Sequence, residues 1–247
     1  MDGSGSHGAN RAYYDAFSAR YEDHRGRNDP GGYHELLDEL ETEFLKPFGS
    51  GRDVLEVGCG TGLLLDRIGR FARSVRGIDI SPEMLKRASE RGHDVREGSA
   101  TELPFDDATF DVTCSFKVLA HVPDATAALR EMARVTKPGG HIVAEFYNRR
   151  SLRFLAKSLL PAGRIADGTT ERQVYTRFDT PRTALGLFPA GLDLVGSRGI
   201  RIITPAAFAM RLPGLRRALR IAERALCDSP FASFGGFWVA AMRKRAE

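Results

Sequence analysis

A glycine-rich turn flanked by two carboxylates is the part of the sequence best suited to chemistry. Residues 54–62 read VLEVGCGTG, an apolar strand that ends in Glu56. The chain then turns through Gly58 and Gly60, where the backbone can approach a ligand closely and the N–H groups of the next helix point at it. Asp79 ends the next apolar run, and its carboxylate can accept two hydrogen bonds from a ribose diol. Such elements at neighbouring strand ends predict a nucleoside site across the carboxyl edge of a sheet.

The spacing of these glycines argues against a dinucleotide cofactor. It is G-x-G-x-G rather than G-x-G-x-x-G, and Glu56 would repel a pyrophosphate while suiting a cationic ligand, which disfavours an NAD-dependent dehydrogenase. Ser81 is the expected cap of the helix that follows, which leaves Asp79 for the ribose. Ile80 and Met84 are placed to pack on an adenine face, although core packing is the alternative for both.

Short β-branched runs alternate with longer helical stretches from Asp53 onward, which predicts β-α-β units and a parallel sheet. Residues 1–10 are expected to be disordered. One domain is expected over 11–247, with a helical cover (11–49), a core (50–148), and a lid with the last strands (149–247). The predicted strands are 53–57, 74–79, 95–98, 110–115, 141–146, 192–203 and 236–243, and the predicted helices are 33–48, 63–71, 82–91, 124–135, 181–187 and 215–226, with a short one near Val118.

Composition narrows the function classes. No apolar run approaches the ~20 residues that span a bilayer, and residues 1–10 lack the basic stretch and the apolar run of a signal peptide, so a cytoplasmic protein is expected. The three cysteines show no C-x-x-C spacing, which predicts reduced thiols rather than disulfides or zinc. Residues 1–147 hold 18 Lys and Arg against 25 Asp and Glu, whereas residues 148–247 hold 18 against 7. The basic rear part is expected to meet an anionic or lipidic partner, unless its arginines are simply solvated.

Four segments follow one another along the chain: residues 54–62, 76–81 (RGIDIS), 97–112 (EGSATELPFDDATFDV) and 137–141 (KPGGH). In this order they resemble the first motif, the second-strand acid, the third and fourth strands, and the turn before the fifth strand of the class I S-adenosylmethionine (AdoMet)-dependent methyltransferases. The likeness is to their small-molecule group in particular, which includes the quinone-biosynthesis methyltransferases, and it runs roughly from Tyr13 to Asn148. It implies an α/β fold with a Rossmann-like, seven-stranded, mostly parallel sheet, helices on both faces, an N-terminal helical cover and a C-terminal helical lid insertion.

The resemblance also implies roles for individual residues. Gly58 and Gly60 would approach the methionine part of AdoMet, Ser99 and Ala100 would flank the adenine, and Phe116 would pass under the cofactor. One of two tyrosines would close over it. Ser99 stands where many relatives have Asp, so one charge-assisted hydrogen bond to the adenine would be lost. The candidate cofactor-binding residues are Tyr14, Tyr21, Glu56, Gly58, Gly60, Asp79, Ile80, Met84, Ser99, Ala100 and Phe116.

His121 is the best-placed candidate for a general base, because it lies one turn past the fourth strand and histidine titrates near neutral pH. Support of the loop is its alternative role. Tyr147 and Asn148, at the end of the fifth strand, are further substrate-facing candidates. The sequence lacks the Asn-Pro-Pro-Tyr tetrad and the Pro-Cys pair of nucleic-acid methyltransferases, and it lacks an acid cluster for Mg²⁺. Metal-free transfer to O, N, C or S of a small molecule, with S-adenosylhomocysteine (AdoHcy) as product, is therefore expected.

The helix expected over residues 213–226 carries apolar and basic faces. Its apolar face is expected to roof an acceptor pocket together with Phe208 and Met210, and its arginines are expected to be solvated or to meet an anionic acceptor. Two alternatives stay open: a non-catalytic AdoMet-binding regulatory subunit, and an RNA methyltransferase that uses the basic rear part. No DNA partner is expected, and the oligomeric state is open. The residues are Leu215, Leu219, Ala222 and Leu226 on the apolar face and Arg216, Arg217, Arg220 and Arg224 on the basic face.

Overall fold

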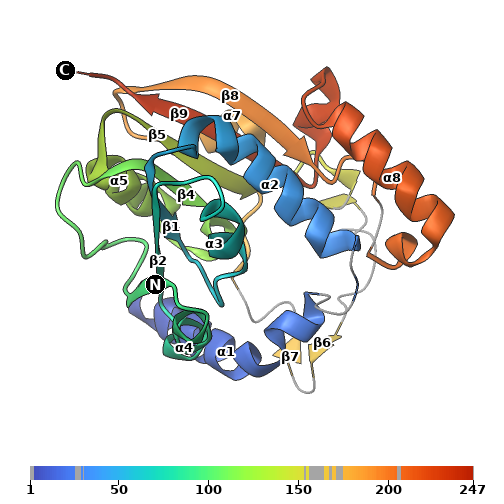
Figure 1. Ribbon diagram of the computed structural model, residues 1–247, viewed down its shortest axis with the longest axis horizontal. Helices are drawn as coiled ribbons and strands as arrows, with labels where there is room; N and C mark the ends of the chain where they lie inside the picture. The colour runs from blue at the N-terminus through green and yellow to red at the C-terminus, as the bar shows by residue number, and fades with distance from the viewer. Residues whose placement is uncertain are drawn as a thin grey trace.

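A seven-stranded sheet in the order β3-β2-β1-β4-β5-β9-β8 carries the fold (Figure 1). The computed structural model describes residues 3–25, 29, 31–152, 154–155, 164–166, 169–170, 175–204 and 207–246. All pairs from β3 to β5 are parallel, while β9 runs antiparallel to both β5 and β8. The predicted mostly parallel α/β sheet is confirmed. Its strands are β1 (Asp53–Val57), β2 (Ser74–Asp79), β3 (Asp94–Glu97), β4 (Phe110–Ser115), β5 (Thr136–Tyr147), β8 (Leu192–Ile200) and β9 (Phe237–Lys244).

Helices connect and cover these strands, as the β-α-β pattern predicts. A separate two-stranded sheet is formed by β6 (Arg164–Ala166) and β7 (Thr169–Thr170). The helices are α1 (Gly3–His24), α2 (Tyr33–Gly49), α3 (Leu63–Ile68), α4 (Pro82–Glu90), α5 (Ala125–Val135), α7 (Pro181–Leu185) and α8 (Pro213–Leu226), and the 3₁₀ turns are η1 (Leu119–His121), η3 (Ala207–Arg211) and η4 (Pro230–Phe234).

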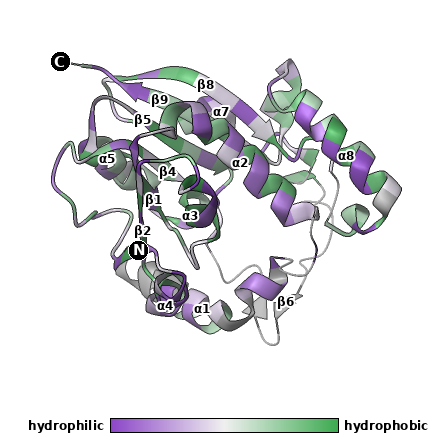
Figure 2. Cartoon of the chain, in the orientation of Figure 1, coloured by the Kyte–Doolittle hydropathy of each residue, from purple (hydrophilic) through white to green (hydrophobic). Residues whose placement is uncertain are grey.

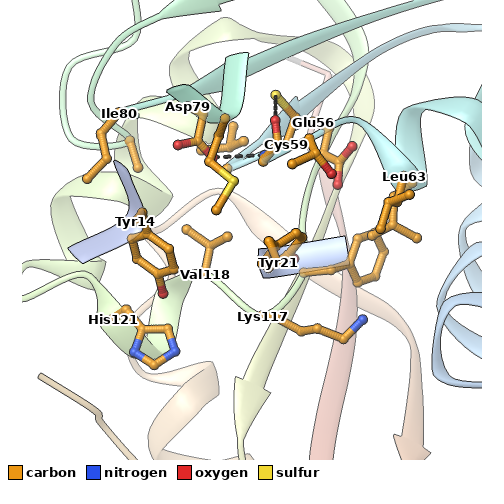
Figure 3. Close-up of a pocket in the computed structure, with 18 of the residues that line it drawn as sticks. Tyr14, Tyr21, Glu56, Cys59, Leu63, Asp79, Ile80, Lys117, Val118 and His121 are labelled. Atoms are coloured by element: carbon orange, nitrogen blue, oxygen red, sulfur yellow. Dashed lines mark hydrogen bonds between the residues drawn. The ribbon is translucent and has the colours of Figure 1, made fainter. Parts of the chain in front are cut away.

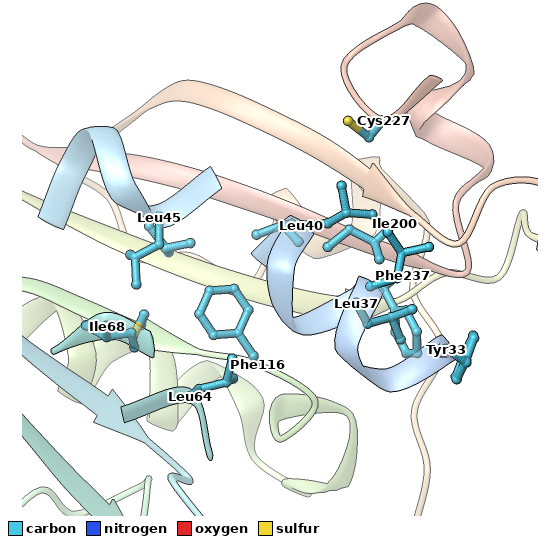
Figure 4. Close-up of a cluster of buried hydrophobic side chains, with 14 of the residues drawn as sticks. Tyr33, Leu37, Leu40, Leu45, Leu64, Ile68, Phe116, Ile200, Cys227 and Phe237 are labelled. Atoms are coloured by element: carbon cyan, nitrogen blue, oxygen red, sulfur yellow. The ribbon is translucent and has the colours of Figure 1, made fainter. Parts of the chain in front are cut away.

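Side chains of successive strand residues enter two separate cores. Val54 joins the core under α2 and α3, while its neighbour Leu55 joins the core under α5 and α7. This alternation follows from the two-residue period of a strand, and burial of both faces explains why the parallel strands are apolar. Figure 4 shows α2 presenting Leu37, Leu40 and Leu45 to the sheet. The cover helix α2 is therefore part of the folding core as well as a wall of the site.

The N-terminal segment corrects one prediction. Residues 3–10 belong to α1, although the sequence predicts disorder there, and residues 1–2 lie outside the described part. Helix propagation costs less than nucleation, so a helix started by the aromatic turn of Tyr13 and Phe17 extends backward through polar residues. Residues 151–160, whose sequence indicates a basic amphipathic stretch, and the Gly-rich loop expected from there to Thr170 lie largely outside the described residues.

The prediction for the basic face of α8 also needs a correction. Three of its arginines pair with acids on or just before α2, so the sequence expectation that they are solvated or face a ligand is wrong. Figure 1 shows α8 beside α2, and Figure 2 shows hydrophilic and hydrophobic residues alternating along α8. An acidic helix at this position supplies the partners that water would otherwise provide. The pairs are Arg216 with Asp29, Arg220 with Glu39, and Arg224 with Glu39 and Glu43.

The expected apolar roof does not form either. Leu215 is 43% exposed and Phe208 is 69% exposed. Neither residue lines the cavity at the carboxyl edge of the sheet, which is described in the next subsection. The buried stripe of α8 is instead Leu219, Glu223 and Cys227, which follow one another at four-residue intervals. The polar Glu223 turns this stripe inward because its carboxylate accepts hydrogen bonds from the loop after β8.

Within the described residues, no helix combines the length and the apolarity needed to cross a membrane.

Leu40 gives a test of the α2 packing. Its side chain is 1% exposed, so Leu40→Ala should leave a void and lower the free energy of unfolding by about 2–5 kcal/mol. Urea denaturation measures this change. The matched control is Leu194→Ala, on a side chain that is 46% exposed, which should change stability by less than about 0.5 kcal/mol. Equal effects of the two variants would contradict the packing described for α2.

Candidate functional site

A cavity of about 660 Å³ opens at the carboxyl edge of the sheet. Its walls come from α1 and α2 and from the segments that follow β1, β2, β3, β4, β5 and β8. This is the edge at which doubly wound sheets bind ligands. Figure 3 shows Asp79 and Glu56 on one side of the cavity and Tyr14, His121 and Lys117 on the other. Every cofactor-binding candidate predicted from the sequence lines this cavity, namely Tyr14, Tyr21, Glu56, Gly58, Gly60, Asp79, Ile80, Met84, Ser99, Ala100 and Phe116.

The glycine turn is required by geometry at two positions. Gly58 has a φ of +81°, and a Cβ atom there would lie 2.2 Å from a methyl carbon of Val118. Gly60 has a φ of +53°, but a Cβ there would meet no atom of the chain within 4 Å. Gly58 therefore permits close packing of the chain on itself, while Gly60 leaves its side of the cavity open to a ligand.

Asp79 is held in place by the same turn. Its Oδ2 accepts the N–H of Gly60 at 2.9 Å, and its Oδ1 accepts the N–H of Ser81 at 3.0 Å. Ser81 caps α4 through a 3.2 Å bond from the N–H of Met84, as predicted. A carboxylate has about four acceptor positions, so Asp79 keeps capacity for a diol at the cavity wall. Burial raises the pKa of Asp79, and the two backbone donors oppose that rise.

Glu56 is buried at the end of β1 with one oxygen directed at no donor. The residue is 2% exposed, and within the described residues its Oε2 has no hydrogen-bond partner. Burial, followed by the nearby Glu41, raises the pKa of this carboxyl well above its usual range. An orphaned buried carboxyl oxygen beside a cavity favours a cationic ligand, because a positive charge would offset the cost of burying the acid.

The cavity lining near the end of β3 includes apolar side chains and the hydroxyl of Ser99. Met84 and Ala100 are buried there, beside Ile80. The hydroxyl of Ser99 accepts the N–H of Thr101 at 3.2 Å and shares a 2.8 Å hydrogen bond with the Thr101 hydroxyl. Ser99 is therefore oriented by its neighbour, and its contact with an adenine stays a prediction.

A buried ionic cluster next to the cavity was not foreseen from the sequence. Lys117 follows β4 with a φ of +62°, and its Nζ donates to Asp38 at 3.0 Å and to Glu41 at 2.6 Å. Arg25 pairs with Asp38 as well. Burial disfavours all these charges, but mutual attraction outweighs burial for Lys117, whose pKa rises, and for Asp38, whose pKa falls to about 2. The only available signal was a lysine inside the apolar run FKVLAHV.

Glu145 adds a further acid to this cluster. It is 1% exposed on β5, its Oε1 accepts the N–H of Lys117 at 3.2 Å, and its Oε2 has no partner among the described residues. Burial and the adjacent Glu41 raise the pKa of Glu145 well above its usual range. Among the described residues, the cluster therefore holds three carboxyls, those of Asp38, Glu41 and Glu145, against the two cations Lys117 and Arg25.

His121 and Tyr147 meet on the cavity wall. Nδ1 of His121 lies 2.9 Å from the carbonyl oxygen of Tyr175, and its Nε2 lies 3.4 Å from the hydroxyl of Tyr147. A carbonyl only accepts, so Nδ1 of the neutral ring carries the proton and Nε2 is an acceptor. The ring of Tyr14 packs edge-on against His121. Both predicted residues line the cavity, and their catalytic roles stay predictions.

Asn148 is not in the cavity, which corrects its expected substrate-facing position. The residue is fully buried, and its Nδ2 donates to the carbonyl oxygens of Ser233 and Gly235 at 2.8 and 2.9 Å. Its Oδ1 accepts the N–H of Arg150. Residues alternate sides along a strand, so Tyr147 and Asn148 cannot both face the cavity.

Comparison with known proteins identifies the family. Residues 55–144 match the model of a methyltransferase domain. A ubiquinone biosynthesis O-methyltransferase of Paracidovorax citrulli is 35% identical over 61% of this chain and 67% of that protein. The chain belongs to the class I AdoMet-dependent methyltransferases.

Other members are matched over less of their length or at lower identity. An enzyme with the same name from Xanthomonas oryzae pv. oryzae is 38% identical over 42% of this chain and 47% of that protein, so the chain spans about half the length of such relatives. A SAM-dependent methyltransferase structure from Thermotoga maritima has a TM-score of 0.65 at 19% identity and covers 93% of this chain and 98% of that one. That likeness concerns the fold alone.

The cavity of this class I family member fits AdoMet, the cofactor of its family. The orphaned Oε2 of Glu56 suits a cationic ligand, the open side of Gly60 admits it, and the anchored Asp79 suits a ribose. Within the described residues, no group of three or more His, Cys, Asp or Glu side chains is arranged to hold a metal ion.

Asp79→Asn tests the ribose contact. The amide keeps the shape but loses a charge-assisted acceptor, so the Kd for AdoHcy should rise about 10- to 100-fold in isothermal titration calorimetry. Asp106→Asn, at an exposed loop position, is the control and should leave the Kd unchanged. A Kd within twofold of the parent for Asp79→Asn, with an unaltered unfolding midpoint, would show that Asp79 does not hold the cofactor.

Glu145→Gln tests the raised pKa of this carboxyl. A raised pKa in the folded state contributes stability at low pH that is lost as the pH rises above the ordinary carboxyl range toward the raised pKa, so the parent should become less stable as the pH increases through that range. The glutamine cannot ionise, and its stability should fall less over this range. Urea denaturation at several pH values measures both slopes. Glu90→Gln, at an exposed site on α4, should keep the parental slope, and an unchanged slope in Glu145→Gln would exclude Glu145 as the titrating group.

Proposed function

We propose that this protein transfers the methyl group of AdoMet to a hydroxyl oxygen of a small molecule, without a metal ion, and releases AdoHcy. The observation that carries the proposal is the orientation of His121, whose acceptor nitrogen lies on the wall of the cavity. Similarity to proteins named O-methyltransferases supports oxygen as the accepting atom. Other accepting atoms, N, C or S, are outcomes that the experiment below distinguishes.

Two acids would hold the cofactor at either end of its polar part. Asp79 would accept hydrogen bonds from the ribose diol, and Glu56 would face the positively charged methionine part, with Gly60 leaving room between them. Tyr14 and Tyr21 from α1 would cover it. When bound, AdoMet supplies a methyl group made electrophilic by its positively charged sulfur.

His121 would act on the acceptor as a general base. The Tyr175 carbonyl fixes the proton on Nδ1, so Nε2 can take the hydroxyl proton as the oxygen becomes nucleophilic. The same carbonyl then faces the imidazolium that results and stabilises its charge. The hydroxyl of Tyr147 lies 3.4 Å from Nε2, and an acceptor hydroxyl would take its place as the hydrogen-bond partner of that nitrogen.

The space beside the cofactor region supports an enzyme over a non-catalytic binder. Tyr33, Tyr147 and Phe237 line the cavity of about 660 Å³ together with the cofactor-binding candidates, which supports space for an acceptor. Three aromatic rings in this part favour a flat acceptor. The ion pairs of α8 with α2 occupy basic residues that an RNA methyltransferase would present to phosphates, which favours the small molecule.

His121→Asn separates catalysis from loop support. The asparagine amide can donate to the Tyr175 carbonyl in place of Nδ1, but it has no counterpart of Nε2. We expect kcat to fall about 10²- to 10⁴-fold while the Kd for AdoMet stays within twofold. The parent rate should decline at acidic pH, where the base is protonated, and the variant should lack this decline. Labelled AdoMet with a panel of phenols and catechols supplies the rates.

His141→Asn is the matched control, because His141 lies on β5 away from the cavity. It should keep the parental kcat and pH profile. A kcat of His121→Asn within threefold of the parent would leave His121 with loop support alone. Binding of AdoMet without transfer to any acceptor would instead support the regulatory-subunit alternative. Product mass spectra identify the accepting atom.

A further inference from the structure

Arg201, which follows β8, is one of the cations that line the cavity. Strand β8 runs parallel to β5, because both are antiparallel to β9, so Arg201 follows β8 at the same carboxyl edge of the sheet. It lies four strand positions from β1 and its Glu56, about 19 Å at ~4.8 Å per position. Arg201 is therefore at the acceptor end of the cavity and not beside the cofactor acids.

The backbone of Arg201 is held in an unfavourable conformation. Its φ is +61°, in the left-handed region that costs a non-glycine residue about 1–2 kcal/mol. Its carbonyl accepts the N–H of Gly236 at 2.8 Å. Such strain persists only where surrounding contacts impose it, and it is concentrated at functional sites.

Glu223 supplies these contacts from α8. Its carboxylate is 1% exposed and accepts four hydrogen bonds from the three residues that follow Arg201. A buried acid that collects this many donors fixes the loop as firmly as a helix cap would. The donors are the N–H of Ile202 at 2.8 Å, of Ile203 at 2.9 Å and of Thr204 at 2.7 Å, and the hydroxyl of Thr204 at 2.7 Å.

The side chain of Arg201 is directed as well. Its guanidinium carbon lies 5.2 Å from the centroid of the Tyr33 ring, and its Nε donates to the carbonyl oxygen of Thr204 at 3.2 Å. Tyr33 and Arg201 both line the cavity, as do Tyr147 and Phe237, whose ring centroids are 5.1 Å apart. A fixed guanidinium beside aromatic walls matches a planar ligand that carries a carboxylate, since the guanidinium fork binds carboxylates at two points.

We propose that Arg201 selects an aromatic acceptor that carries a carboxylate, and that it binds this carboxylate while the acceptor hydroxyl lies at His121. This inference rests on the proposed methyl transfer. Strand β8 lies three strand positions beyond β4, or about 14 Å of sheet edge. This distance suits one ring with a short acidic arm between the two groups. Arg201 is thus a specificity residue for the acceptor.

Paired acids and amides test the charge preference. Enzyme saturated with AdoHcy is titrated calorimetrically with 4-hydroxycinnamate and its amide, and with 4-hydroxyphenylacetate and its amide. In at least one pair, we expect the acid to bind about tenfold or more tightly than the amide. Arg201→Gln should reduce the ratio to within twofold without weakening the amide. Arg201→Lys should keep part of the preference, because it retains the charge but not the fork.

Arg243→Gln, an exposed position on β9, changes the net charge equally and should keep the parental ratio. Equal binding of acid and amide by the parent in both pairs, or a preference that survives Arg201→Gln, would overturn the assignment. Methyl transfer is measured in parallel. Transfer to neutral phenols without any acid preference would support the proposed function and contradict the role proposed for Arg201. An Arg201-dependent acid preference without transfer to any hydroxyl would support that role and contradict the proposed function.

Discussion

The charge of Lys117 is the constraint around which the site is built. An ammonium taken out of water is costly unless acids meet it closely, and here the acids come from the cover helix α2. The lysine follows β4, beside the residues that lead to His121, while Asp38 and Glu41 belong to a helix that buries its leucines on the sheet. The ionic contact and the apolar contact therefore fix the same helix twice. Removing Lys117 would leave Asp38 and Glu41 buried with less positive charge beside them.

The same helix carries charge on its outer side. Glu39 and Glu43 of α2 meet arginines of α8, and Glu223 on α8 holds the loop that presents Arg201. A chain of polar contacts thus connects the strand end of β4 to the far end of the cavity through two helices. Each step is an ion pair or a set of hydrogen bonds between elements that are distant in sequence.

The separation of contacting residues along the sequence decides which parts of the site could be predicted. The glycine turn, Asp79 and the Ser81 cap are local patterns, and the order of apolar runs is enough to place them on one sheet edge. Lys117, by contrast, is separated by 79 positions in the sequence from Asp38 and by 76 positions from Glu41. Contacts over such distances leave no local sequence pattern. Asp38 and Glu41 belong to the acidic face of the amphipathic segment 33–48, and amphipathicity does not distinguish a face that meets water from one that meets a buried cation. The ion pairs of the α8 arginines could not be predicted for the same reason.

The end of β5 at Tyr147 divides the cavity between two stretches of chain. Residues that face the expected cofactor precede it, whereas Phe237 and Arg201 at the far wall follow it, and the family match stops at residue 144. Substitutions in the last hundred residues would therefore change the part of the cavity proposed for the acceptor and leave the part proposed for the cofactor intact. The choice of acceptor and the affinity for the cofactor would then depend largely on different stretches of the chain, which meet at the end of β5.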